Sequence, residues 1–301
     1  MQHVFAGAAL GLALTLGLRA AYRHLVPMSS VAPRRLVALA TLWCVLFTLE
    51  SFLIGPGGAA LSAALGGAVL VSLLALRTRK ARAIVRASAL LGDERTRAEA
   101  CRTIEHLLGP APARATGAYR RWANLAMLAA GQAAQASAAR EALGWAERID
   151  PTGLEPAVVA VRALFVSDLT LAISHDRAEA RRVLTGVPRP SADPPTERAL
   201  AAHEALLDAL TGDAESAEGR ARAGLAAESE PILRWKWQFA RAHALASLER
   251  RDEALEVVRA LARADNGELA LTNLVCHAGP ASPLAESLLT EGRDRAPSRS
   301  S

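Results

Sequence analysis

The sequence contains few of the residues that build disulfide frameworks and metal sites. Its three cysteines, Cys44, Cys101 and Cys276, lie far apart and form no CxxC pair or Cys/His cluster. Cys44 falls in an apolar run and the other two fall on predicted helices, so the spacing supports neither a disulfide framework nor a zinc site. We therefore expect no metal ion and no cofactor.

Recognisable catalytic motifs are also missing. His203 and Glu204 begin like the zinc-protease motif HExxH, but Leu207 occupies the position of the second ligand. One histidine cannot hold a catalytic zinc ion, and we interpret His203 as a histidine on a helix surface. The seven histidines are scattered and accompany no plausible nucleophile, and the glycine-rich stretch 55–58 lacks the Lys-Ser/Thr of a phosphate loop. The sequence therefore predicts no catalytic residue, and we expect the protein not to be an enzyme.

Lysine is scarce, and basic residues are concentrated at one end of the chain. Lys80 and Lys236 are the only lysines among 35 basic residues; with the abundance of alanine, this suggests a GC-rich bacterial genome. A net charge of +5 and a pI of about 9.7 would fit a nucleic-acid partner. However, residues 1–92 hold nine basic side chains and a single acidic one, Glu50, which leaves 26 basic and 29 acidic residues for 93–301. Because the larger part is slightly acidic, we expect no nucleic-acid partner.

Three long apolar runs occupy the first 76 residues, at about 4–21, 36–54 and 59–76. A helix needs roughly 17–25 mostly apolar residues to cross a bilayer, so the three runs predict three transmembrane helices and a membrane domain over 1–76. The first run is marginal in length and has no Lys or Arg before it, whereas Arg19 and Arg23 follow it. A cleaved signal peptide has the opposite polarity, so we interpret this run as a retained span.

The basic residues around these runs predict their orientation. The first loop carries four arginines and the second connection, 55–58, carries no charge. The third run is followed by a basic cluster: Arg77, Arg79, Lys80, Arg82 and Arg86. Because Lys and Arg are retained on the cytoplasmic side, the N-terminus is expected outside and everything after the third run inside. We expect the basic cluster to contact anionic lipid headgroups.

From residue 77 onward the pattern predicts an all-α soluble region: a basic juxtamembrane helix over 77–92, a helical array over 93–291 and a disordered tail over 292–301. Five helix starts align on a small residue 39, 41, 39 and 35 residues apart: Ala100, Ala139, Ala180, Gly219 and Ala254. This spacing is typical of stacked helical hairpins, here an α-solenoid of about five. Asp93, Asp213 and Asp252 stand where a carboxylate can cap a helix start.

Two stretches of the array resemble the tetratricopeptide repeat family. Trp122-x-x-Leu125-Ala126-x-x-Ala129 is similar to the first-helix pattern of that repeat, and residues 139–151 are similar to its second helix and terminating proline. Residues 242–255 match again. The usual period is 34 residues, and most of the spacings here are longer, so another α-hairpin repeat remains open. The resemblance implies a curved array whose concave side binds a protein or peptide.

Two aromatic and basic clusters are the candidate partner-binding residues. Both combine rings with cationic side chains, a composition typical of interaction hot spots, although one face of each helix must be core. The first comprises Arg234, Trp235, Lys236, Trp237 and Arg241, and the second comprises Tyr119, Arg120 and Arg121.

The sequence leaves two functions open. The first is a membrane-anchored adaptor of the bacterial inner membrane that presents a cytoplasmic helical array to an unknown protein or peptide. The alternative is an accessory subunit of an export, envelope-assembly or transport complex, in which the transmembrane helices make the main contacts. The enzyme hypothesis would return if acidic and basic residues converged in a closed pocket with perturbed pKa values.

Overall fold

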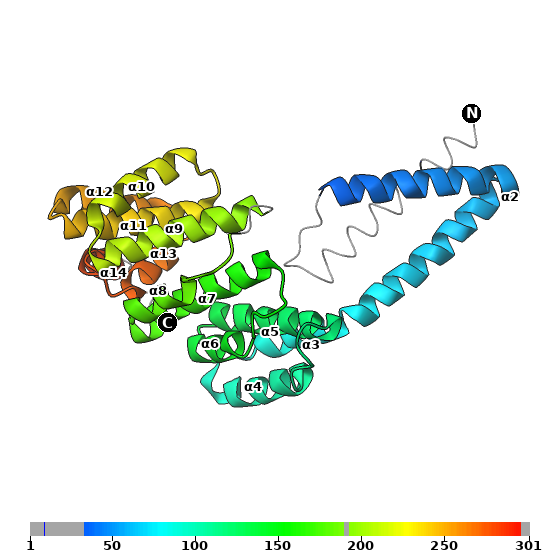
Figure 1. Cartoon of the computed structure of the whole chain (residues 1–301), viewed down its shortest axis with the longest axis horizontal. Helices are drawn as coiled ribbons and strands as arrows, with labels where there is room; N and C mark the ends of the chain where they lie inside the picture. Colours follow the sequence, from blue (N-terminus) through cyan, green and yellow to red (C-terminus); the bar gives the residue numbers. More distant parts are fainter. Residues whose placement is uncertain (1–8, 10–32, 190–192, 296–301) are drawn as a thin grey trace. The chain divides into compact units, whose positions relative to one another are not determined.

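A computed structural model describes residue 9, residues 33–189 and residues 193–295. The described residues contain helices and no strand, so the expected all-α class is confirmed (Figure 1). The chain divides into two compact units, Met1–Gly109 and Pro110–Ser301.

The first unit begins with the long helix α2, Pro33–Arg77, which bends at Gly55 (Figure 1). Gly55 has φ 81° and ψ 164°, a backbone conformation open to glycine and strained for other residues. The two halves of α2 turn back on each other there, and the Ser62 hydroxyl donates to Glu50 Oε1 at 3.3 Å. The small residues Ser51 and Ala59 are fully buried near the bend. The turn expected at 55–58 is therefore the bend of a helical hairpin.

The three expected transmembrane helices are not confirmed. The first run, 4–21, lies almost wholly outside the described residues. The other two lie in α2, where the apolar stretches Thr41–Gly55 and Gly57–Val69 are short for a span. Among the described residues, Pro156–Ser174 is long and apolar enough to cross a membrane, but 44% of it is buried and it packs against α8, α9 and α13, as the core helix of an array does.

Helices α3, Arg79–Ser88, and α4, Glu94–Leu108, complete the first unit and pack as a hairpin. Ile84 and Ile104 are fully buried. Asp93 caps α4 by accepting a hydrogen bond from the backbone N–H of Arg95 at 3.0 Å, as its position in the sequence indicates.

The second unit is a solenoid-like succession of helical pairs. The pairs are α5 (Gly117–Gln135) with α6 (Ala139–Glu147), α7 (Pro156–Ser174) with α8 (Arg177–Leu184), α9 (Pro194–Thr211) with α10 (Ala214–Ala227), α11 (Pro231–Ser247) with α12 (Arg251–Arg263), and α13 (Gly267–Cys276) with α14 (Ser282–Arg295). The second helix of each expected hairpin is present, and α13 and α14 form a further pair. Because α14 continues through Arg295, the first four residues of the expected tail are helical; the rest of that tail lies outside the described residues.

The last pair does not simply extend the stack. Helix α13 packs against α7 as well as against α12. Arg177, at the start of α8, donates to the backbone carbonyls of Leu210 at 2.7 Å and Ala278 at 2.9 Å. The space between α7 and α13 is thus filled by packed side chains, and one core runs from α7 to α14.

Alanine substitutions at two glycines of α10 are expected to change stability in opposite directions. A Cβ at Gly224 would overlap the ring of Trp237, whereas a Cβ at Gly219 would meet no atom. Gly219→Ala should therefore stabilise the protein by about 0.5–1 kcal/mol through helix propensity. Gly224→Ala should destabilise it by about 1–3 kcal/mol, because the Trp237 ring must move out of a packed core. Urea unfolding followed by tryptophan fluorescence measures both; equal effects would contradict the close packing of Trp237 on α10.

Candidate functional site

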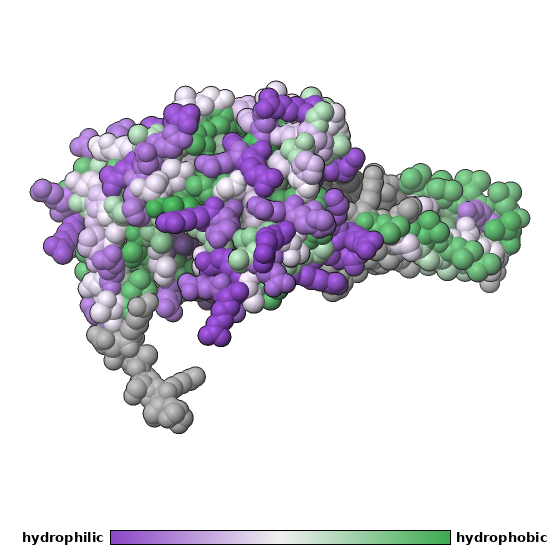
Figure 2. Space-filling model, turned by 90° about the horizontal axis from the view of Figure 1, so that it is seen from below, coloured by the Kyte–Doolittle hydropathy of each residue, from purple (hydrophilic) through white to green (hydrophobic). Residues whose placement is uncertain are grey.

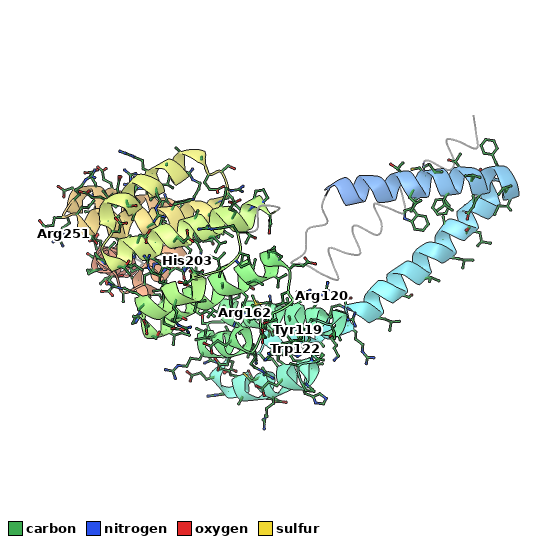
Figure 3. The ribbon with its side chains drawn as sticks, in the orientation of Figure 1. Tyr119, Arg120, Trp122, Arg162, His203 and Arg251 are labelled. Atoms are coloured by element: carbon green, nitrogen blue, oxygen red, sulfur yellow. The ribbon has the colours of Figure 1, made fainter. Side chains whose placement is uncertain are left out.

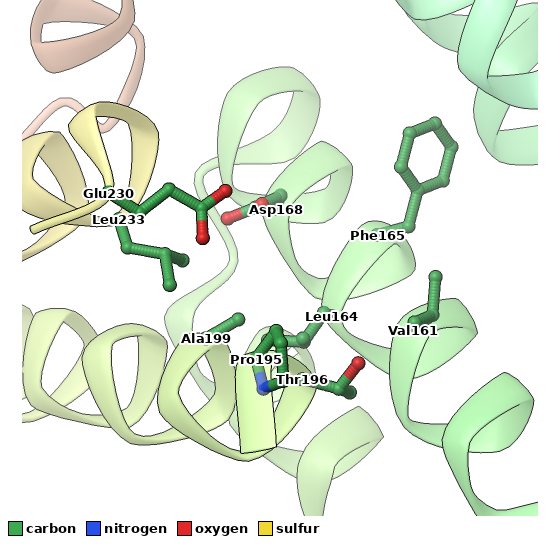
Figure 4. A pocket seen from close by; sticks show the side chains of 9 residues that line it. All are labelled: Val161, Leu164, Phe165, Asp168, Pro195, Thr196, Ala199, Glu230 and Leu233. Atoms are coloured by element: carbon green, nitrogen blue, oxygen red, sulfur yellow. The ribbon is translucent and has the colours of Figure 1, made fainter. Parts of the chain in front are cut away.

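A groove of about 330 Å³ lies in the second unit where α7, α9 and α11 meet (Figure 4). It is lined by Val161, Leu164, Phe165 and Asp168 of α7, by Pro195, Thr196 and Ala199 of α9, and by Glu230 and Leu233 at the start of α11. These are the first helices of three successive pairs. We call this hollow the α7–α9–α11 groove.

Local sequence positions two helix starts at the groove. Helices α9 and α11 both begin with proline, which suits the first helical turn because it needs no backbone N–H donor there. The Thr196 hydroxyl donates to Asp193 Oδ2 at 2.6 Å and fixes the entry to α9. Glu230, which immediately precedes α11, forms no ion pair with any residue that the structure describes. In Figure 4 the side chains of Glu230 and Asp168 point toward each other.

Asp168 of α7 links the three helices of the groove through contacts with α9 and α11. Its carboxylate pairs with the Lys236 ammonium of α11 and lies 2.9 Å from His203 Nδ1 of α9. Burial alone would raise the pKa of Asp168, but the charges of Lys236 and His203 outweigh it and hold this pKa far below its usual value. The Asp168 side chain is 37% exposed, whereas the His203 side chain is fully buried. The buried His203 therefore helps to hold the Asp168 carboxylate in place at the groove.

His203 is not on the helix surface, and that expectation was wrong (Figure 3). Its Nε2 lies 2.8 Å from the Ser167 hydroxyl, so Ser167, His203 and Asp168 are arranged like a nucleophile, a base and an acid. Ser167 is nevertheless fully buried, and its hydroxyl donates to the backbone carbonyl of Ala180 at 2.8 Å. With no exposed surface on Oγ, this arrangement links α7, α8 and α9 and offers no attacking group to a substrate.

Two further histidines lie deeper in the same core. The rings of His243 and His277 are 5.6 Å apart, and His243 Nδ1 accepts the backbone N–H of Ala281 at 3.2 Å. Burial lowers the pKa of His277 to about 4, and burial together with the charges of His277 and Arg177 lowers the pKa of His243 well below its usual value. Both rings are therefore neutral at pH 7. No group of three or more metal-ligating side chains occurs among the described residues.

The structure separates the residues of the first expected cluster. Trp237 is buried against Gly224, and Trp235 is half-buried against the same core. Arg234 donates to the carbonyls of Leu225 and Glu228. Arg241 pairs with Glu218 at 3.5 Å, and only Lys236 reaches the groove, through Asp168.

The second expected cluster is divided in the same way (Figure 3). Arg120 and Arg121 are exposed, whereas Tyr119 is buried and stacks on Trp122. The Tyr119 hydroxyl accepts the N–H of Asp150 at 2.6 Å and donates to the carbonyl of Asp150 at 2.9 Å, which ties α5 to the end of α6. Tyr119 therefore has a structural role in joining these two segments.

Removing the two hydrogen bonds between the Tyr119 hydroxyl and the backbone of Asp150 should destabilise the protein. Tyr119→Phe keeps the ring and leaves two backbone groups of Asp150 without their partner, so we expect a loss of about 1–2 kcal/mol in the free energy of unfolding. Thermal unfolding of the full chain measures it. Arg120→Gln, one residue away and exposed, is the control and should change stability by less than about 0.5 kcal/mol.

Sequence reasoning missed the groove and both of its carboxylates. Asp168 carried one signal: it is the single acidic residue in the apolar stretch 156–174. Glu230 carried none, because its place at the groove depends on how three helices meet.

Comparisons with known proteins add no family to this description. No family model, no curated protein and no solved structure matches the chain.

Proposed function

We propose that this protein is a membrane-anchored adaptor that presents the α7–α9–α11 groove to a protein or peptide partner. The observation that carries the proposal is the exposed apolar surface of α2, joined in one chain to an array of helical pairs. Eleven of the fifteen exposed large hydrophobic side chains among the described residues lie on α2, including Phe52, Leu53 and Ile54. Figure 2 shows that hydrophobic residues dominate the part of this helix that is in view.

A bilayer is the environment that suits this surface. Monomers in water rarely leave apolar patches of this extent uncovered. Both halves of α2 are apolar, the bend at Gly55 is uncharged, and basic residues follow Arg77, a pattern that supports a helical hairpin with both ends on the cytoplasmic side of an inner membrane. Cytoplasmic localisation of the array follows from that orientation.

The groove supports the choice of ligand. Its walls are apolar, and its polar end carries Asp168, which Lys236 partly neutralises, and Glu230, which has no ionic partner among the described residues. A matching segment carries an apolar side chain next to a Lys or Arg. The resemblance to tetratricopeptide repeats agrees with this use, since first helices of successive pairs line the groove.

Site-specific photo-crosslinking in cells tests the adaptor. A photoreactive residue at Val161, which is 43% exposed in the groove, should give one discrete adduct. The same residue at Leu269, which is 55% exposed on α13, should give none. Ala199→Arg fills the groove and should abolish the Val161 adduct. Adducts of equal yield at both positions, or an adduct insensitive to Ala199→Arg, would refute the groove as the binding site.

The accessory-subunit alternative rests on the same exposed surface of α2 and predicts a different result. A chain that begins at Arg82 should keep the Val161 adduct if the array is the binding module, and lose it if α2 makes the main contacts. Reporter fusions after Gly57 and Arg86 test the orientation independently: the first should be exported and the second retained. Export of the Arg86 fusion would overturn the proposed topology.

A further inference from the structure

The hydrophobic surface of α2 passes directly into a row of arginines. Thr78 separates α2 from α3 by a single residue, and its backbone (φ −93°, ψ 1°) is close enough to helical that its carbonyl accepts the N–H of Arg82 at 2.9 Å, so the helical spacing carries on from α2 into α3. Five positions, spaced by four, three, four and three residues, fall on one face of such a helix: Ser72, Leu76, Arg79, Ala83 and Arg86. The face is apolar at its α2 end and cationic at its α3 end.

These side chains, together with Arg82, line an open hollow of about 660 Å³. Arg79 and Arg86 are exposed and form no ion pair with any described residue. The opposite side of α3 is closed, because Ile84, Ala87 and Ser88 are buried. The guanidinium groups therefore face outward at the hollow.

The neighbouring sequence leaves this charge without compensation. Residues 51–92 contain no Asp or Glu, so α3 and the second half of α2 supply no carboxylate to the hollow. Guanidinium groups bind phosphate with paired, parallel hydrogen bonds, which a lysine ammonium cannot reproduce. Leu76, 67% exposed at the apolar edge, offers a contact for hydrocarbon next to that phosphate position.

We propose that this hollow binds the phosphate headgroup of one anionic phospholipid, held by Arg79 and Arg86, with its acyl chain along Leu76. This inference rests on the proposed membrane anchoring and makes it more specific: a discrete lipid site replaces a diffuse attraction between a basic cluster and the bilayer surface. The site sits where the apolar helix ends, at the depth of the headgroups.

Native mass spectrometry of the full-length protein in neutral detergent tests the site. Titration with phosphatidylglycerol and with phosphatidylcholine of the same acyl chains should show one bound phosphatidylglycerol with at least about ten-fold preference. Arg79→Gln/Arg86→Gln should abolish the preference. Arg95→Gln/Arg102→Gln, which removes the same charge from exposed positions on α4, should leave it intact.

Two further arms separate the competing explanations. Arg79→Lys/Arg86→Lys keeps the charge, so a loss of at least about three-fold in affinity supports paired guanidinium contacts, and an unchanged affinity would reduce the site to diffuse electrostatics. Leu76→Gln should weaken the binding of the lipid and leave any binding of inorganic phosphate unchanged. If millimolar inorganic phosphate displaces the lipid, the ligand is free phosphate and the lipid assignment fails.

Failure of the lipid site and failure of the membrane anchor are distinguishable. Fractionation of cells that express the wild-type chain reports anchoring without reference to lipid type. A protein in the membrane fraction that shows no preference for phosphatidylglycerol would overturn the lipid site alone, whereas a protein absent from that fraction would overturn both.

Discussion

Replacing Asp168 with asparagine is expected to lower the free energy of unfolding by about 2–3 kcal/mol. The substitution keeps the size of the side chain and removes the charge that pairs with Lys236 and His203. Breaking a fully buried pair costs about 3–5 kcal/mol, because it leaves an uncompensated charge. Asp168 is 37% exposed, so solvent screens part of this effect and the expected loss is smaller.

Urea unfolding of the full chain in detergent, followed by tryptophan fluorescence, measures the Asp168 effect. Glu230→Gln is the matched control, because it removes a second carboxylate from the same groove, one that has no ionic partner among the described residues, and should change stability by less than about 0.5 kcal/mol. The double variant Asp168→Asn/Lys236→Met should recover part of the loss, since the Lys236 ammonium is then not left without its partner. If Asp168→Asn lowered the free energy of unfolding as little as Glu230→Gln does, the contacts of Asp168 with Lys236 and His203 would not stabilise the fold.

Acidification from pH 7 to pH 4 is expected to destabilise the second unit by about 3 kcal/mol through His277. Its pKa is about 4 in the folded protein, against about 6.5 in an unfolded chain. Between these values the unfolded state binds more protons than the folded state, so stability is complete above about pH 6.5 and is lost as pH falls toward 4. His243, whose pKa is also lowered, acts in the same direction.

The groups around His277 do not reverse this sign. Asp168 tends to raise its pKa and His203 and Lys236 tend to lower it, but burial is the larger cause. The free energy of unfolding measured by urea at pH 7.5, 6, 5 and 4 should therefore fall steadily. His277→Gln should reduce the dependence above pH 4 and leave the part that is due to His243, and His106→Gln, on the first unit, should leave the dependence unchanged. A wild-type chain equally stable at pH 5 and pH 7.5 would contradict the neutral, buried state of both rings.

Periodicity predicted the array well because helical spacing depends on local sequence. Ala100, Ala180 and Ala254 recur where a second helix packs closely against the first, and all three are buried. The bend at Gly55 was equally local, since a cluster of Gly and Pro leaves few other conformations. Local patterns could not show which face of each helix meets the next one.

The candidate site was harder to predict for that reason. Trp237 next to Lys236 looked like a contact surface, but Gly224, thirteen residues earlier, provides the space that buries the ring. His203 looked exposed because its partners Ser167 and Asp168 come from α7, some 35 residues away. A single sequence contains no local sign of contacts between helices so far apart.

The contact between α13 and α7 determines how the second unit comes apart. In an open stack each repeat touches only its neighbours, so the end repeat can be lost while the rest persists. Here α13 packs against α7, and Arg177 of α8 donates to the carbonyl of Ala278, 101 residues further along the chain. Loss of α13 and α14 would uncover the middle of the array, so unfolding from the C-terminal end is coupled to the loss of the α7–α9–α11 groove itself.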